Sequence, residues 1–136
     1  MNSIPVFRPA VLALALAAVS PAAPAQKAAA RPVIAGLHAL SMNKPIVIGS
    51  STGGVQSIEV VLRALPVQTP GIVIVQHMPP VFTALLAQRL QRDAGRSCVE
   101  AKDGMPVVPG CTYVAPGDWH MLVHTVEGQP VIRLEQ

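Results

Sequence analysis

Short, continuously apolar runs alternate along this chain with longer segments in which apolar residues recur every three or four positions. Residues 45–49 and 71–75 are rich in Val and Ile and are bounded by Pro or Gly, which is typical of strands buried in a parallel sheet. Each run is followed by a helical stripe, made first of Val55, Ile58, Leu62 and Leu65 and then of Phe82, Leu85, Leu86 and Leu90. Two strand–loop–helix units in succession predict an α/β fold built on a parallel sheet.

The pattern changes after Gly95, where the second helix is expected to end. Residues 99–110 are rich in Gly and Pro and are interpreted as a turn-rich link. Residues 112–115 and 120–123 flank a Pro-Gly-Asp-Trp turn and predict a β-hairpin. Residues 131–134 read as the start of another strand, which suggests that further sequence belongs to this domain.

The first 41 residues have a different composition, dominated by Ala, Pro, Val and Leu, and two interpretations stay open. An apolar run at 10–19 followed by Ala23-Pro24-Ala25 fits a secretory signal within residues 1–25, although the run is too short to span a bilayer. The prolines instead suit an interdomain linker, or upstream sequence included by a misplaced start. In either case residues 1–41 are expected not to pack against the domain at 42–136.

Bulk composition narrows the classes of function. The chain has 136 residues, enough for one small domain, and is 51% hydrophobic but only 3% aromatic. Its net charge is +3, yet four of its arginines fall in or just after the predicted helices and are interpreted as solvated helix faces, not as a nucleic-acid site. These are Arg63, Arg89, Arg92 and Arg96. Two isolated cysteines lack metal-site spacing, so a metal site is not expected.

Candidate chemistry lies in the loops that follow the two predicted strands. Residues 50–54, Ser-Ser-Thr-Gly-Gly, form a tight turn before a helix, which can expose a serine and direct helical N–H groups at a developing negative charge. His77 follows the next strand, and neighbouring parallel strands end on one rim, so His77 can act as base for the serine. The same turn is also typical of an anion site or of a simple tight turn, and it matches neither the phosphate loop nor G-x-S-x-G.

Other titratable residues are weaker candidates. His120 and His124 lie on the predicted hairpin without an acidic cluster. Asp118, in a Pro-Gly-Asp turn, is expected to hydrogen-bond its own backbone.

Three segments in order carry a resemblance to a known family: IGSSTGG, then IVIVQHMPPVFTALLAQRL, then EAKDGMPVVPGCTYVAPGDWHMLV. Residues 44–124 resemble the first part of the catalytic domain of chemotaxis protein-glutamate methylesterases (CheB type). Aligning the family's G-A-S-T-G-G turn on Gly49 places the nucleophile at Ser51, and the family's Q-H-M-P segment places the base at His77. The residues assigned to the oxyanion site and substrate binding are Thr52, Gly53, Gly54 and Met78.

The resemblance implies a three-layer, Rossmann-like α/β domain with a mostly parallel sheet and helices on both faces. It also implies hydrolysis of glutamate methyl esters on chemotaxis receptors through a serine ester, with deamidation of glutamines as an accompanying activity and no cofactor. The implied partners are the cytoplasmic domains of methylated receptors and an upstream receiver domain, with no nucleic acid and no stable membrane insertion. The implied location is the cytoplasm; a real signal at 1–25 would instead imply export.

One element of the family pattern has no counterpart in the sequence. The family's triad aspartate lies near the end of the domain in a G-M-G-x-D-G segment, which these 136 residues do not contain. Asp93, Asp103 and Asp118 match other family positions. We therefore expect residues 42–136 to form a catalytic domain truncated at its C-terminus, with little activity by itself. The alternatives are a catalytically inactive remnant or binding module of the same fold, and an exported protein of unrelated function.

Overall fold

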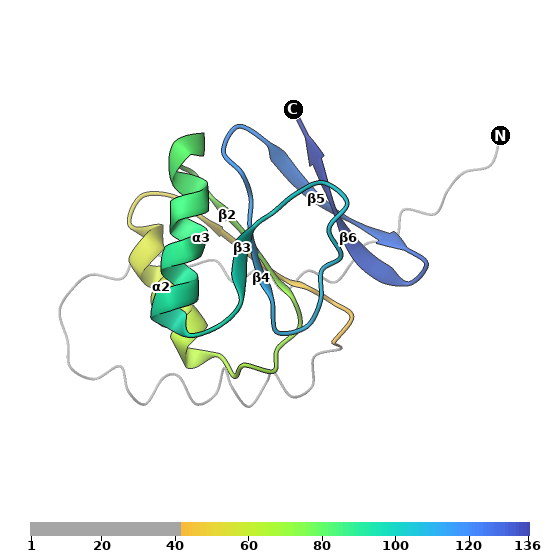
Figure 1. Cartoon of the computed structure of the whole chain (residues 1–136), viewed down its shortest axis with the longest axis horizontal. Coiled ribbons are helices and arrows are strands. Elements are labelled where there is room, and N and C mark those ends of the chain that lie inside the picture. Colours follow the sequence, from red (N-terminus) through yellow and green to blue (C-terminus); the bar gives the residue numbers. More distant parts are fainter. Residues whose placement is uncertain (1–41) are drawn as a thin grey trace.

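The computed structural model describes residues 42–136; the N-terminal segment with its linker and signal interpretations lies outside them. The elements, in chain order, are β1 (Ile46–Ser50), α2 (Gly54–Ala64), β2 (Ile72–Gln76), α3 (Pro80–Ala94), β3 (Cys98–Glu100), β4 (Thr112–Val114), β5 (His120–Val126) and β6 (Gln129–Glu135). Figure 1 shows a sheet with helices on one side and a two-stranded ribbon on the other.

The main sheet has four parallel strands in the order β1-β2-β4-β3. This arrangement confirms the predicted α/β fold and the two expected strands at its start. The helices, however, do not lie on both faces: among the described residues α2 and α3 pack side by side on one face (Figure 1). The reason is topological, because successive right-handed crossovers that step in the same direction place both helices on the same side.

The helix-side core follows the predicted apolar stripe of α2 but only half of that of α3: Leu86 and Leu90 are buried, whereas Phe82 and Leu85 are 50% and 57% exposed. Its buried members are Ile48, Ile58, Leu62, Ile72, Ile74, Leu86, Ala87, Leu90, Cys98 and Val114. Helix α2 ends where Leu65 turns extended (φ −79°, ψ 140°), because the residue before Pro66 is disfavoured in the helical region. Helix α3 begins at Pro80, where the missing N–H costs nothing, and ends at Gly95 in the left-handed region (φ 64°). In the part of the chain that the structure describes, no helix is both long and apolar enough to cross a membrane.

The opposite face of the sheet is covered by the β5–β6 ribbon and the loop that precedes β4. A second core joins Val73, Ala101, Val107, Tyr113 and Ile132. The ribbon turns at Glu127 (φ 50°) and Gly128 (φ 81°), and two successive positive φ angles suit the right-handed twist of a tight hairpin.

Residues 112–115 and 120–123 therefore do not form the hairpin that the sequence predicted. Residues 112–114 make β4, an inner parallel strand between β2 and β3, whereas β5 pairs with β6. All three residues of β4 are buried, which suits a strand covered on both faces. An unpredicted strand, β3, overlaps the start of the turn-rich link, and its three residues are too few to show a period.

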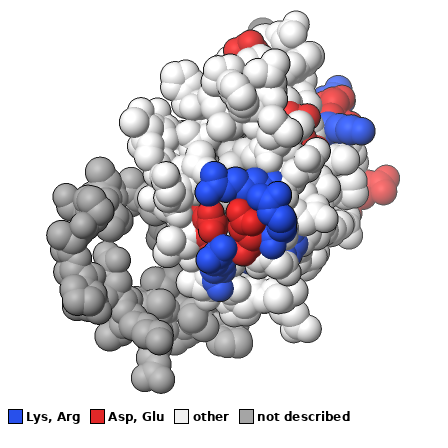
Figure 2. Space-filling model, turned by 60° about the vertical axis from the view of Figure 1, so that its left-hand side comes forward, with Lys and Arg blue, Asp and Glu red and all other residues white. Residues whose placement is uncertain are grey.

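Charged side chains gather on the outer surface of α2 and α3 (Figure 2). Glu59 accepts from Arg63 at 2.8 Å and from Arg89 at 3.2 Å. Asp93 pairs with Arg92 at 2.9 Å, and the hydrogen bond from Arg92 is the main cause that lowers the pKa of Asp93 below its ordinary value. Arg63, Arg89 and Arg92 are therefore paired and solvated, which agrees with the prediction that they lie on solvated helix faces.

Arg96 departs from that interpretation because it is buried, with 5% of its surface exposed. Its Nη2 atom donates to Thr69 Oγ1 at 2.6 Å, and burial lowers the pKa of the guanidinium. Arg96 follows the end of α3 and reaches under the loop that leaves α2, so its long side chain fills the core edge there. Sequence periodicity could not place it, since it lies just beyond the helix.

Burial also controls the chemistry of the cysteines. It raises the pKa of the Cys98 thiol to about 12, whereas Cys111 is half-buried. Thiolate is the reactive form, so near pH 8 the reactive fraction of Cys98 is about 10³-fold below that of an ordinary thiol. We expect an aromatic disulfide reagent to modify Cys111 in the native chain and Cys98 only after denaturant is added. Cys111→Ser should remove the fast phase and Cys98→Ser the denaturant-dependent one. Equal rates for both thiols in the native chain would contradict this.

Candidate active site

The strand register places Ser51 and His77 at equivalent positions on neighbouring strands. Ser50 of β1 is paired with Gln76 of β2, so Ser51 and His77 are the next residues of the two strand ends. The His77 N–H donates to the Ser50 carbonyl oxygen at 3.0 Å, which extends the ladder by one step. Both Ser51 and His77 are exposed. The predicted meeting of serine and histidine on one rim of the sheet is therefore present in the backbone.

The turn from β1 into α2 depends on its glycines. Gly53 adopts the left-handed region (φ 76°), which glycine enters at little cost. The Gly54 N–H donates to the Ser51 carbonyl oxygen at 2.9 Å. A Cβ atom on Gly54 would lie 2.5 Å from Ser50 Cβ and 2.6 Å from Gln76 Oε1, so no larger residue fits. Because α2 begins at Gly54, the serine turn leads directly into the helix N-terminus, where the N–H groups that follow Gly54 have no intrahelical partner.

Gln76 is a residue of this site that sequence reasoning missed. It is 7% exposed, and its Oε1 accepts from the Ser50 hydroxyl. Its Nε2 donates to the Ser51 carbonyl oxygen at 2.8 Å and to the His77 carbonyl oxygen at 3.3 Å. A signal was available in the sequence: Gln76 is the one polar residue in the β2 run Ile-Val-Ile-Val-Gln, and buried polar groups need partners.

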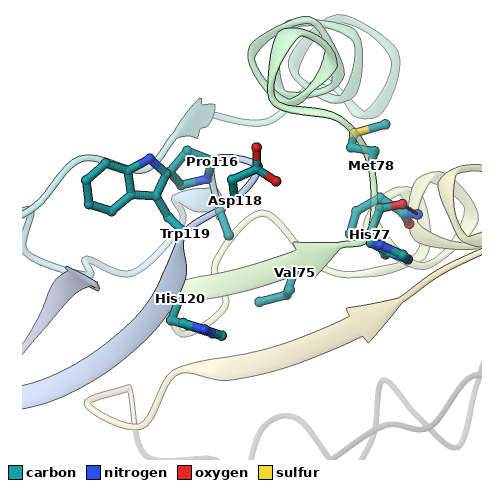
Figure 3. Close-up of a pocket in the computed structure, with 10 residues that line it drawn as sticks. Val75, His77, Met78, Pro116, Asp118, Trp119 and His120 are labelled. Atoms are coloured by element: carbon teal, nitrogen blue, oxygen red, sulfur yellow. Dashed lines mark hydrogen bonds between the residues drawn. The ribbon is translucent and has the colours of Figure 1, made fainter. Parts of the chain in front are cut away.

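A cavity of about 330 Å³ opens beside His77. It is lined by Val75, Gln76, His77, Met78, Ala115, Pro116, Gly117, Asp118, Trp119 and His120. Figure 3 shows His77 and Met78 on one side, with Asp118 and Trp119 of the β4–β5 loop and His120 at the start of β5 across from them. Residues 51–54 do not line it. The structure thus brings Met78 and His77 to the cavity, whereas Ser51, Thr52, Gly53 and Gly54 lie outside its lining.

The far wall of the cavity differs from the sequence-based expectation. Asp118 adopts a positive φ of 63°, and among residues 42–136 its carboxylate makes none of the expected bonds to its own backbone. Gly117 packs so tightly on Pro80 that a Cβ atom would lie 2.5 Å from Pro80 Cα. Trp119 is 41% exposed at the cavity edge and was not singled out by its sequence context.

The electrostatic surroundings of His77 are sparse. Within residues 42–136, its ring forms no hydrogen bond or ion pair with a carboxylate, although Asp118 lines the same cavity. The searched part of the chain, residues 42–136, also holds no group of three His, Cys, Asp or Glu side chains placed to bind a metal ion.

Comparison with known proteins decides which family this arrangement represents. Residues 46–136 match the family model described as CheB methylesterase. The chain belongs to the CheB methylesterase family. A relative from Chromohalobacter salexigens, named protein-glutamate methylesterase/protein-glutamine glutaminase, is 48% identical over 96 residues, covering 71% of this chain and 27% of the relative. One of the same name from Enterobacter cloacae is 54% identical over 82 residues, covering 60% of this chain and 23% of the relative. This chain thus spans about a quarter of the curated relatives that it matches.

The fold agrees with a CheB domain of known structure. The crystal structure of the Thermotoga maritima CheB methylesterase catalytic domain matches with a TM-score of 0.65 and 44% sequence identity. The match covers 71% of this chain and 51% of that chain. The resemblance inferred from the IGSSTGG, Q-H-M-P and APGD segments is confirmed.

Proposed function

We propose that residues 42–136 form part of a catalytic domain that hydrolyses glutamate methyl esters on proteins, and that also deamidates glutamines, with Ser51 as nucleophile. The observation that carries this proposal is the register of β1 and β2, which sets an exposed serine and an exposed histidine on one rim. The names of the CheB relatives supply the reaction class.

The proposed reaction is an acyl transfer in two steps. Ser51 Oγ attacks the ester carbonyl carbon while His77 accepts the hydroxyl proton. The oxyanion that forms is stabilised by the Thr52 N–H and by the free N–H groups in the first turn of α2, which follow Gly53 and Gly54 in the chain. Collapse expels methanol, which takes its proton from His77. Water then attacks the acyl-serine, again with His77 as base, and releases glutamate; with a glutamine substrate the first product is ammonia.

The proposed partners follow from the family. The proposed substrates are methylated glutamates on the cytoplasmic domains of chemoreceptors, and the proposed location is the cytoplasm. The cavity beside His77 and Met78 is suited to hold the segment that carries the ester. Residues 1–41 are proposed to link this domain to an upstream receiver domain.

The proposal is tested with a peptide that carries a glutamate γ-methyl ester, incubated with an excess of the chain. We expect slow release of methanol and a transient acyl group on the peptide that contains Ser51, measured by mass spectrometry in ¹⁸O-water. The same peptide with free glutamate is the control. Methanol release without any acyl-Ser51 would remove the serine mechanism.

A second candidate is a binding module of the same fold without turnover. Such a module would need no carboxylate at the His77 ring, and within residues 42–136 that ring has none. If the methyl ester peptide binds the chain but neither methanol nor acyl-Ser51 forms, this second candidate replaces the first.

A further inference from the structure

We propose that Gln76 is a positioning residue that sets the peptide plane between Ser51 and Thr52 and thereby aims the Thr52 N–H at the oxyanion. Its catalytic consequence rests on the function proposed above, whereas its geometric part stands independently. Gln76 belongs to β2, so it fixes the serine turn from the neighbouring strand and not from within the turn itself.

The hydrogen bonds determine how the Gln76 amide is oriented. Its Oε1 faces the Ser50 hydroxyl, which can donate. Its Nε2 faces two carbonyl oxygens, those of Ser51 and His77, which can only accept. Rotating the amide by 180° would set Oε1 against both carbonyls and lose both bonds. One buried side chain therefore joins the carboxyl ends of β1 and β2.

The Ser51 carbonyl is held by two donors. Gln76 Nε2 lies 2.8 Å from it, and the Gly54 N–H lies 2.9 Å from it. In a trans peptide the C=O and the following N–H point in opposite directions. Turning the Ser51 carbonyl inward to these donors therefore turns the Thr52 N–H outward. Thr52 is exposed, and within residues 42–136 its N–H donates to no backbone carbonyl, so it is available to an oxyanion.

Without Gln76, a single hydrogen bond from Gly54 would hold this plane. One bond of this kind contributes about 1 kcal/mol, which is comparable to thermal energy, and the plane could then turn so that its carbonyl faces outward. An outward carbonyl would repel the oxyanion that it should help to stabilise. The loss of one oxyanion donor lowers turnover by about 10²-fold or more.

Two variants and a matched control separate the two ends of the amide. Gln76→Met keeps the length of the side chain and removes all three side-chain hydrogen bonds. Gln76→Glu replaces the donating nitrogen by oxygen. Ser50→Ala is the control, since it removes the partner of Oε1 and leaves both Nε2 bonds in place. The rate of Ser51 phosphonylation by a fluorophosphonate, in which Ser51 Oγ bonds to phosphorus and fluoride leaves, reports catalytic competence. The Thr52 amide signal in ¹H–¹⁵N NMR spectra reports the plane.

We expect the maximal phosphonylation rate to fall about 10²-fold in Gln76→Met and Gln76→Glu, with the half-saturating reagent concentration changed less than about threefold. Ser50→Ala should lower the rate by no more than about tenfold, the size of one neutral hydrogen bond. The Thr52 signal should shift and broaden in both Gln76 variants and stay in place in Ser50→Ala. A Gln76 variant that folds and reacts at the wild-type rate would overturn the proposal.

The wild-type chain provides a test that needs no folded variant. Both side-chain N–H protons of Gln76 are buried and donated, so they should exchange with solvent far more slowly than those of the exposed Gln56. Equal exchange rates for the Gln76 and Gln56 side-chain protons would overturn the proposal even if both variants unfold. If wild-type Ser51 reacts no faster than other exposed serines, the proposed function fails. The geometric part of the proposal, the orientation of the Ser51–Thr52 peptide plane, is then tested by the Thr52 amide signal alone. An unchanged signal in Gln76→Met would refute that part.

Discussion

Giving His77 a carboxylate partner is expected to raise ester hydrolysis by about 10⁴-fold, the loss that follows when such a partner is removed from a serine triad. Within residues 42–136 the ring has no such partner. A carboxylate that accepts from the ring would hold one tautomer and stabilise the charged imidazole that forms when Ser51 is deprotonated. In the family that these residues resemble, the triad aspartate lies in a G-M-G-x-D-G segment.

The measurement compares this chain with a chimera. The chain is joined to the remaining part of the Thermotoga maritima catalytic domain, of which it covers 51%. Initial rates of methanol release from the methyl ester peptide are then compared at equal concentrations. Replacing the aspartate of the added segment by asparagine should return the chimera to the rate of the chain alone. Equal rates for the chain and the chimera would show that His77 needs no carboxylate.

Ser51→Ala is expected to have the largest single effect, and its size should depend on the carboxylate. Loss of a triad serine costs about 10⁶-fold in an intact hydrolase, while loss of the carboxylate alone costs about 10⁴-fold. The two losses are not additive, because the residues act as one unit. Ser51→Ala should therefore cost about 10⁶-fold in the chimera and only about 10²-fold in the chain alone.

Ser50→Ala is the matched control for this experiment, since both serines lie in the same turn. The Ser50 hydroxyl is engaged with Gln76 Oε1, whereas Ser51 is exposed, so Ser50→Ala should keep the acyl group on residue 51. Acylation is located by mass spectrometry of peptides from the trapped protein. An acyl group on Ser50, or undiminished turnover by the Ser51→Ala chimera, would remove Ser51 from the mechanism.

The sequence predicted those parts of the fold that leave a local period. The strands at 45–49 and 71–75 were found because a strand buried on both faces leaves a continuous apolar run. The helices after them were found because burial on one face imposes a repeat every three or four residues. The rim that joins Ser51 and His77 followed as well, because successive parallel strands are usually neighbours in a sheet, as β1 and β2 are here. Candidate nucleophile and candidate base were thus available before the structure.

Tertiary structure decided what depends on contacts between segments far apart in the chain. Residues 112–114 read equally well as a hairpin arm and as an inner strand, and only pairing with β2 and β3 placed them in the sheet. Arg96 was predicted to lie on a solvated helix face, but its side chain is buried under the loop that leaves α2. Gln76 stood out in the sequence as the one polar residue of its apolar run, but only the tertiary structure showed that it bonds to Ser50 and Ser51 of the neighbouring strand end. Local periodicity reports which face of an element is apolar; it carries no information about which distant segment that face, or a buried polar side chain, will meet.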